Sequence, residues 1–229
     1  MSDQKAQLTR REKVEVREQA ILDAARDVFI ERGYDGARMV EIAQRAGIAE
    51  GTIYLYYRTK TELMKAVVGA FWIRLTTDAK AAVRSHDDPF TALHALARFH
   101  LRAVIERFDV IGLSRALPDK LDDPTALHGE LKTYVSVFDE IFRRGIDRGV
   151  VAPDAVLWMA RDVFYGSLEY SARTLMQRGQ HFDADTVDNL MALLRTHYAP
   201  APSSVSGPDQ DPAALMARLE SAVDRLEQI

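Results

Sequence analysis

Residues 33–60 read GYDGARMVEIAQRAGIAEGTIYLYYRTK, a stretch with two short apolar periodicities separated by a glycine. Two helices that cross steeply over a turn of three or four residues leave room for only a small side chain at the crossing, and Ala43 supplies it. Gly47 follows where the chain must leave the first helix through left-handed backbone angles, which glycine adopts without a steric penalty. This spacing predicts a helix-turn-helix.

The two predicted helices each have an inward and an outward face. The inward positions at helical spacing are apolar: Ile42, Ile48, Ile53 and Tyr57. The outward positions carry short or amphipathic side chains, which suit a DNA groove because hydroxyls bond phosphates or base edges and apolar groups meet thymine methyls. We predict that they contact DNA: Glu50, Thr52, Tyr54, Leu55 and Tyr56. Arg38 and Lys60 flank the motif and are predicted to bind phosphates.

The segments on either side complete a three-helix unit. Upstream, the apolar stripe from Ile21 to Phe29 predicts a helix that ends at Gly33. Three cations, Arg10, Arg11 and Lys13, are expected to precede that helix in an N-terminal arm. Downstream, Thr59-Lys60-Thr61-Glu62 has the form of a capping box, which opens a new helix.

Residues 17–66 resemble the tetracycline-repressor (TetR) family of bacterial transcription regulators. The motifs that carry the resemblance are Ile21-Leu22-Asp23-Ala24-Ala25, Phe29, Arg32-Gly33-Tyr34, Glu41-Ile42-Ala43, Ala46-Gly47-Ile48, Gly51-Thr52-Ile53-Tyr54 and Lys60-Thr61-Glu62-Leu63. The family usually has Ser or Thr near positions 38 and 49, where this chain has Arg38 and Ala49. Losing such a helix cap costs about 1 kcal/mol, while Arg38 offers a phosphate-binding cation in exchange.

Composition narrows the functional class. The 229 residues include no cysteine, which excludes disulfides and thiolate metal sites and gives no sign of an oxidising compartment. Residues 1–65 hold 12 basic and 11 acidic side chains, whereas the whole chain carries a net charge of −4. The polar N-terminus shows no signal peptide and no apolar run approaches membrane-spanning length, so we expect a cytoplasmic protein without a membrane partner.

The remainder of the chain shows no sustained strand alternation, so we predict an all-α fold in which a three-helix helix-turn-helix domain precedes a helical ligand-binding and dimerisation domain. Helix starts are expected at Asp88-Pro89, Asp123-Pro124 and Pro153-Asp154, and helix ends at Gly149 and Gly179. The expected helices are near 61–85, 89–107, 110–117, 125–148, 153–178 and 184–197. The expected domains are 1–60 for DNA binding, 61–198 for effector binding and dimerisation, 199–212 as a Pro/Ser-rich linker, and 213–229 as a short heptad helix.

The second domain is rich in aromatic residues at helical spacing. Such residues are more often core than cavity, but a domain attached to a DNA-binding unit needs an input, and pockets between bundle helices bind apolar molecules. The candidate effector-binding residues are Phe71, Phe99, Arg102, Phe108, Leu113, Tyr134, Phe138, Phe164 and Tyr165. Cations suited to the mouth of a pocket are Arg98, Arg102, Arg107, Arg115 and Lys120.

Dimerisation is expected because one recognition helix reads only a few base pairs, so two must lie about 34 to 36 Å apart to read successive major grooves. By resemblance, residues 153–178 and 184–197 would form the homodimer interface. Residues 162–174 are similar to a helix of the fatty-acid-degradation repressors, which implies a long-chain acyl-CoA effector. The alternatives are a drug-like or aromatic ligand of an efflux or catabolic regulator, and a helical interaction module that binds no DNA.

An enzyme finds no support in the motifs. The chain has no phosphate loop, nucleophile elbow or paired-histidine metal motif, and its six histidines are scattered. We therefore predict no catalytic residues, no metal site and no cofactor.

Overall fold

The computed structural model describes residues 9–115 and 129–200, and these ranges contain helices and their connections but no strand. The all-α prediction is confirmed. The helices are α1 (Arg10–Gly36), α2 (Met39–Arg45), α3 (Glu50–Tyr56), α4 (Lys60–Val83), α5 (Pro89–Glu106), α6 (Phe108–Arg115), α7 (Gly129–Asp147), α8 (Leu157–Gln177) and α9 (Ala184–Tyr198).

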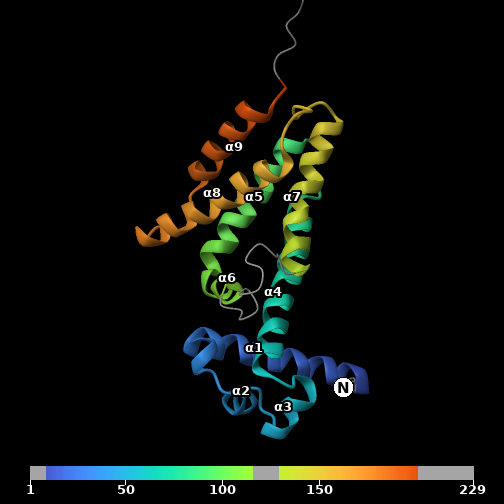
Figure 1. Cartoon of the computed structure of the whole chain (residues 1–229), viewed down its shortest axis with the longest axis vertical. Coiled ribbons are helices and arrows are strands. Elements are labelled where there is room, and N and C mark those ends of the chain that lie inside the picture. Colours follow the sequence, from blue (N-terminus) through green and yellow to red (C-terminus); the bar gives the residue numbers. More distant parts are fainter. Residues whose placement is uncertain (1–8, 116–128, 201–229) are drawn as a thin grey trace, which may run out of the picture.

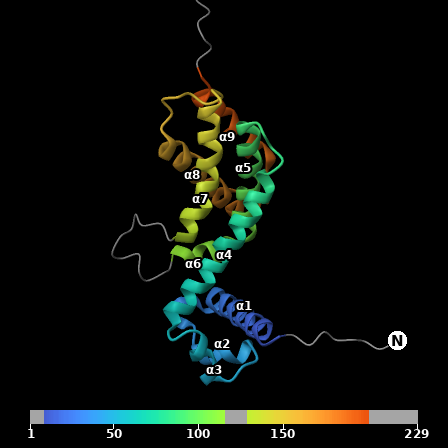
Figure 2. The same cartoon turned by 90° about the vertical axis from the view of Figure 1, so that its right-hand side faces the viewer.

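The molecule is elongated, with α1, α2 and α3 at one end and α5, α7, α8 and α9 at the other (Figures 1 and 2). The long helix α4 belongs to both ends, since it packs on α1 near its start and on α5 and α7 further along. Helix α6 lies between the two ends and contacts α1. A change in the tilt of α4 or in the position of α6 would therefore reach α1 directly, and α1 packs on α2 in the predicted DNA-binding unit, α1–α3.

Several helix starts follow the sequence signals. Asp88 caps α5 with a hydrogen bond from the Thr91 amide, and Pro89 occupies the first turn. Thr59 caps α4 by accepting from the Glu62 amide at 3.1 Å. The Glu62 carboxylate accepts from the Arg58 amide instead of closing the capping box.

Two expectations are corrected. Arg10, Arg11 and Lys13 lie inside α1 and not before it, because Thr9 and Glu12 form a capping box that starts the helix at Arg10. The helix expected from residue 153 starts at Leu157. Pro153 and Asp154 form a turn closed by the Ala155 amide on the Ala152 carbonyl at 3.1 Å, and proline fits the second position of such a turn as well as it fits a helix start.

Some expectations fall on residues that the structure does not describe. The start at Asp123-Pro124, Lys120, and the heptad helix 213–229 lie outside the described ranges, as do residues 201–212 of the expected linker.

Candidate DNA-binding surface and effector region

The turn between α2 and α3 is held by backbone hydrogen bonds. The Gly47 amide donates to the Gln44 carbonyl at 3.1 Å, and the Ile48 amide donates to the Ala43 carbonyl at 3.0 Å. Gly47 has a φ of +69°, which confirms the left-handed position that its place in the sequence predicted. Ala43 is fully buried at the crossing and serves packing, whereas Gly47 is exposed and sets the turn.

The outward face of α3 is free of intramolecular packing at its centre. Leu55 is 84% exposed and Tyr54 is 44% exposed, while Ile53 and Tyr57 point inward and are buried. The other predicted contacts vary in exposure: Glu50 is exposed, and Thr52 and Tyr56 are half-buried. The face that could enter a DNA groove is therefore centred on Tyr54 and Leu55.

Neither helix of the motif has a side-chain cap. Arg38 is the N-cap residue of α2 and Ala49 that of α3, and the side chain of neither accepts a hydrogen bond from the first turn. Arg38 is exposed and forms no ion pair within the described residues. Its guanidinium is free to meet a phosphate.

The ammonium group of Lys60 already has partners inside the protein. Nζ donates to the carbonyl oxygens of Asp35 at 3.2 Å and Ala37 at 3.0 Å, and it lies 4.5 Å from the centre of the Tyr34 ring. These contacts tie the start of α4 to the end of α1. Lys60 therefore has at most one ammonium hydrogen left for a phosphate.

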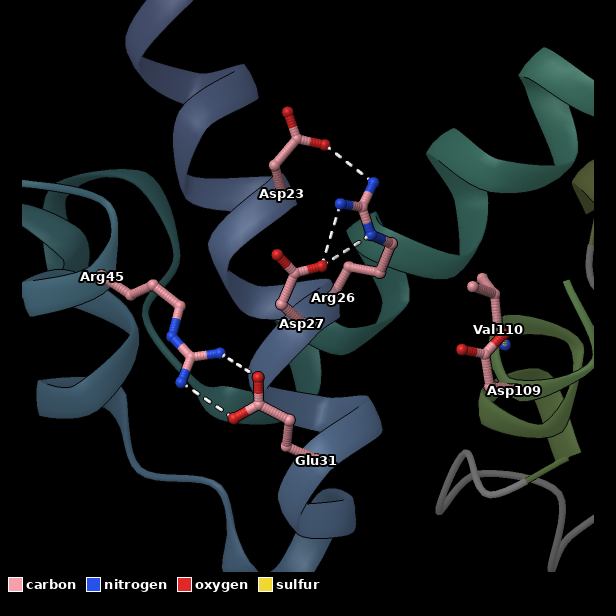
Figure 3. A network of polar contacts seen from close by, with 7 residues as sticks. All are labelled: Asp23, Arg26, Asp27, Glu31, Arg45, Asp109 and Val110. Carbon is pink, nitrogen blue, oxygen red and sulfur yellow. Dashed lines mark hydrogen bonds and ion pairs between the residues drawn. The ribbon is translucent and has the colours of Figure 1, made fainter.

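An ion-pair network joins α1 to α2 (Figure 3). Arg45 donates from both terminal nitrogens to Glu31, at 2.5 and 2.9 Å, and the bond from Arg45 lowers the pKa of the Glu31 carboxyl. Arg26 bonds Asp23 and Asp27 on the same helix. Because Arg26 and Arg45 are held by carboxylates, they stiffen the unit and offer little charge to DNA.

Helices α5, α7, α8 and α9 form the C-terminal body (Figure 1). Four of the nine predicted effector-binding residues fill a packed core in this body. Tyr134, Phe138, Phe164 and Tyr165 are all buried. The Phe138 ring lies 4.9 Å from that of Phe164 and 6.2 Å from that of Tyr165, and Tyr134 lies 5.8 Å from Tyr165. These rings occupy the space that a ligand would need.

A buried histidine lies at the centre of this core. Nδ1 of His100 hydrogen-bonds the Tyr134 hydroxyl at 2.8 Å, and the His100 ring meets the Tyr165 ring edge-on at 4.8 Å. Burial lowers the pKa of His100 to about 3 and raises that of Tyr165. Nε2 of His100 and the Tyr165 hydroxyl are buried without a hydrogen-bond partner among the described residues.

The other five predicted effector-binding residues are spread over two hollows and the core. Phe71 lines a cleft of about 420 Å³ between α1, α4 and α6, and Phe99 and Arg102 line a hollow of about 70 Å³. Phe108 is half-buried and Leu113 is buried. The described residues thus form no single cavity around all nine.

The cleft between α1, α4 and α6 also contains residues that the sequence did not single out. Arg74 lines it together with Arg107, a cation already expected near a pocket mouth, and neither pairs with a carboxylate of the described residues. Val67 and Val110 add apolar surface, while Glu106 and Asp109 add negative charge. The sequence has no signal for this set, because its members come from three helices that meet only in the fold.

A second groove of about 490 Å³ lies between α4 and the start of α7. Its lining includes Ile73, which is 60% exposed, and Thr76, Thr77 and Thr133. None of these residues belongs to the predicted set.

Helices α8 and α9 expose a row of large apolar side chains. The exposed fraction is 57% for Trp158, 43% for Val163, 71% for Tyr170 and 69% for Leu193, and Val156 and Met159 are also exposed. Leu190 and Leu194 instead pack into the body. An exposed apolar surface of this kind is typical of a protein–protein interface.

Two further findings bear on partners. Within residues 9–115 and 129–200, each helix is too short or too polar to cross a bilayer. The same ranges contain no group of three acidic or histidine side chains placed to hold a metal ion.

Comparison with known proteins agrees with this geometry. Residues 21–67 match the family described as bacterial regulatory proteins, tetR family. The chain is 27% identical over 173 residues to the fatty acid metabolism regulator protein of Bacillus subtilis, which covers 74% of this chain and 88% of that protein. It is 36% identical over 88 residues to the transcriptional activator FasR of Mycolicibacterium smegmatis. That match covers 38% of this chain and only 36% of FasR.

A solved structure shares the fold over most of its length. The transcriptional regulator FadR from Bacillus subtilis, in complex with stearoyl-CoA, superimposes with a TM-score of 0.67 at 22% identity, over 78% of this chain and 97% of that one.

Proposed function

Because the chain belongs to the tetR family of bacterial regulatory proteins, we propose that its exposed α3 face reads operator DNA and that an effector bound in the body releases it. The family binds operator DNA as dimers and responds to small molecules, so the chain is a ligand-responsive transcriptional regulator and not an enzyme.

The observation that carries the proposal is the exposed face of α3. Tyr54 and Leu55 are exposed on a helix that buries Ile53 against the core, and Thr52 is half-buried on the same helix. A seven-residue helix with such a face fits the major groove, where hydroxyls and apolar groups read base edges. Arg38 at the start of α2 supplies a cation for the adjacent phosphates.

The dimer is proposed to form through α8 and α9. The exposed row of Trp158, Val163, Tyr170 and Leu193 supports this assignment, because a monomer would leave these side chains in water. Two copies joined at this end carry their α3 helices at the other end of the elongated molecule (Figure 1). Val163→Asp would place an unpaired charge in the interface, and we expect it to yield monomers in analytical ultracentrifugation.

The effector is proposed to be a long-chain acyl-CoA, a class that includes the stearoyl-CoA bound in the FadR structure. Such a ligand combines an apolar chain with an anionic head. The cleft between α1, α4 and α6 offers Phe71 and Val67 beside Arg74 and Arg107, two cations that form no ion pair within residues 9–115 and 129–200. A ligand there would contact the DNA-binding unit and the body at once, and it acts only if it binds the released state more tightly than the operator-bound state.

The test of DNA binding uses Thr52→Ala/Tyr54→Ala and a duplex selected by the wild-type protein from a random library. Each base contact contributes about 1–3 kcal/mol, so we expect at least tenfold weaker binding by fluorescence anisotropy and an unchanged dimer. Ile73→Ala/Thr77→Ala is the control, since it removes one threonine and one large exposed apolar side chain from α4. Selection of no duplex at all would favour a helical interaction module.

The test of the effector adds stearoyl-CoA or free CoA to the protein–duplex complex. We expect stearoyl-CoA to release the duplex and CoA alone to leave it bound. Release by drug-like aromatic compounds and not by stearoyl-CoA would assign the protein to efflux or aromatic-compound regulation.

A further inference from the structure

The first eleven residues of α1 extend beyond the folded body. Every residue from Thr9 to Ala20 is exposed, and burial begins abruptly at Ile21. In Figure 1 this N-terminal part of α1 projects past α3 at the DNA-binding end of the molecule. We call residues 10–20 the overhang.

The overhang is held as a helix mainly by contacts within the helix, because each of its residues is exposed. Its capping box is closed in both directions, with the Thr9 amide 2.6 Å from Oε2 of Glu12 and the Glu12 amide 3.3 Å from Oγ1 of Thr9. Arg11 and Glu15 add an ion pair at 2.8 Å one turn apart. A separate helix of this length is marginal in water, but this one continues a helix that is anchored in the core. The helix therefore fixes the direction in which each side chain leaves the backbone.

The unpaired cations of the overhang lie on one stripe. Arg10, Lys13 and Arg17 are spaced three and four residues apart, and none forms an ion pair or hydrogen bond through its side chain within the described residues. The same stripe continues through Ile21, Ala24 and Val28, which are buried against the other helices of the DNA-binding unit.

This stripe gives the cations a direction. Since the buried part of the stripe faces the core that α1 shares with α2 and α3, its exposed continuation points to the same side of α1 as those helices. The carboxylates of the overhang lie elsewhere. Glu12 and Glu15 are on the opposite side of the helix, and Glu18 accepts a hydrogen bond at 3.0 Å from the hydroxyl of Tyr57, at the end of α3.

The recognition helix itself has no positive charge. Its seven residues, EGTIYLY, include one acid and no base. Of the cations next to it, Arg45 pairs with Glu31 and Lys60 bonds two carbonyl groups, which leaves Arg38 and Arg58 without an ion pair among the described residues. Tight binding to a duplex needs several cations that displace counterions from phosphates, so cations on another element would add to the two that flank α3.

We propose that the overhang is a second DNA-binding element, in which Arg10, Lys13 and Arg17 bind the phosphate backbone of the duplex that flanks each half-site. The proposal rests on α3 reading the operator. Eleven helical residues span about 16 Å, which matches about five phosphates of one strand at about 3.4 Å each. The overhang adds affinity that does not depend on base sequence and extends the footprint outward from the half-site.

The test is the salt dependence of binding by Arg10→Ala/Lys13→Ala/Arg17→Ala. Each lost phosphate contact lowers the slope of log K against log salt by about 0.9, so the loss of six contacts in a dimer lowers it by about 5. We expect at least tenfold weaker binding at low salt. Arg84→Ala/Lys132→Ala/Arg178→Ala removes the same charge from exposed positions of the body, and its slope should match that of the wild type.

Two further measurements keep the result unambiguous. Arg10→Lys/Arg17→Lys should bind as the wild type does, because phosphates accept either cation, whereas a role in folding that needs arginine geometry would not be rescued. Trimming the duplex outside the half-sites should weaken the wild type and leave the triple variant unchanged. An unchanged slope in the triple variant would overturn the overhang alone, while failure of the wild type to select any duplex would overturn DNA recognition by α3.

Discussion

The DNA-binding unit and the C-terminal body use burial in opposite ways. In the unit, two seven-residue helices bury Ile42 and Ile53 and leave Tyr54 and Leu55 in solvent, so the core is scaffold and the surface is the site. In the body, Tyr134 and Phe138 lie in the centre of a filled aromatic core. Protein interiors are close-packed, so a ligand can reach those rings only by moving them, whereas DNA can meet α3 without rearrangement. The cleft between α1, α4 and α6, where we propose that the effector binds, lies outside these rings.

The contrast is tested most strongly by paired truncations, Phe138→Ala in the body and Leu55→Ala in the unit. Phe138 packs against three aromatic rings, so its truncation should lower the free energy of unfolding by about 3–5 kcal/mol. Leu55 is 84% exposed, so its truncation should change stability by less than about 0.5 kcal/mol while weakening operator binding. Urea unfolding and anisotropy titration measure the two effects. A large stability loss in Leu55→Ala would mean that the α3 face is packed in solution.

The buried histidine, His100, makes the free energy of unfolding depend on pH. Because burial lowers the pKa of His100 to about 3 from 6.5, the unfolded chain binds a proton below pH 6.5 that the folded chain does not. The free energy of unfolding should therefore fall as pH decreases from about 6.5 toward 3, by up to about 1.4 kcal/mol per pH unit from this group.

His100→Gln retains a hydrogen-bonding side chain beside Tyr134 and removes the titration, so its unfolding free energy should depend less steeply on pH over that range. His181→Gln, at an exposed position, is the control. Equal slopes in wild type and His100→Gln, measured by urea unfolding at several pH values, would show that His100 is accessible to protons in the folded protein.

The same difference between the regions explains what the sequence could predict. In the unit, the helical periodicity of apolar residues predicts that Ile53 is buried and Tyr54 exposed, and the turn predicts a left-handed backbone at Gly47. Both predictions succeed because they depend only on neighbouring residues. In the body, the apolar periodicity of α7 predicts correctly that Phe138 faces inward. It carries no information on whether a cavity lies there, because a cavity depends on how several helices pack together.

The hydrogen-bond partners of polar side chains are a second feature that the sequence does not predict. The sequence marks Lys60 as a cation beside a DNA-binding motif, but its partners are backbone carbonyl groups at the end of α1, which no residue type encodes. The start of α8 is not predicted correctly for a similar reason. Proline fits both a turn and a helix N-terminus, so Pro153 does not distinguish the two. The turn is accompanied by a hydrogen bond from the Ala152 amide to the distant Tyr198 carbonyl, which the sequence does not show.

Replacing Lys60 distinguishes a structural role of its ammonium group from a role in binding DNA phosphate, and the expected effect is smaller. Lys60→Met keeps an apolar stem beside Tyr34 and removes the ammonium group, so it should destabilise the unit by about 1–2 kcal/mol, the partly exposed geometry limiting the loss. Hydrogen exchange at the end of α1 should accelerate. If Lys60 mainly bound phosphate, stability would be unchanged and the salt slope of the dimer would drop by about 2.

The smallest expected effect concerns the missing caps of the motif. Ala49 has φ −67° and ψ 143°, the extended geometry of an N-cap residue, but no side chain that can accept from the first turn of α3. Ala49→Ser should supply that acceptor and raise the free energy of unfolding by up to about 1 kcal/mol. Arg38→Ser provides the matched case at α2, where a similar cap is gained but an unpaired cation is lost. We therefore expect both variants to be stabilised, and only Arg38→Ser to bind the operator more weakly with a reduced salt slope. Equal operator affinities would mean that Arg38 meets no phosphate, and the DNA-binding charge would then fall to other residues.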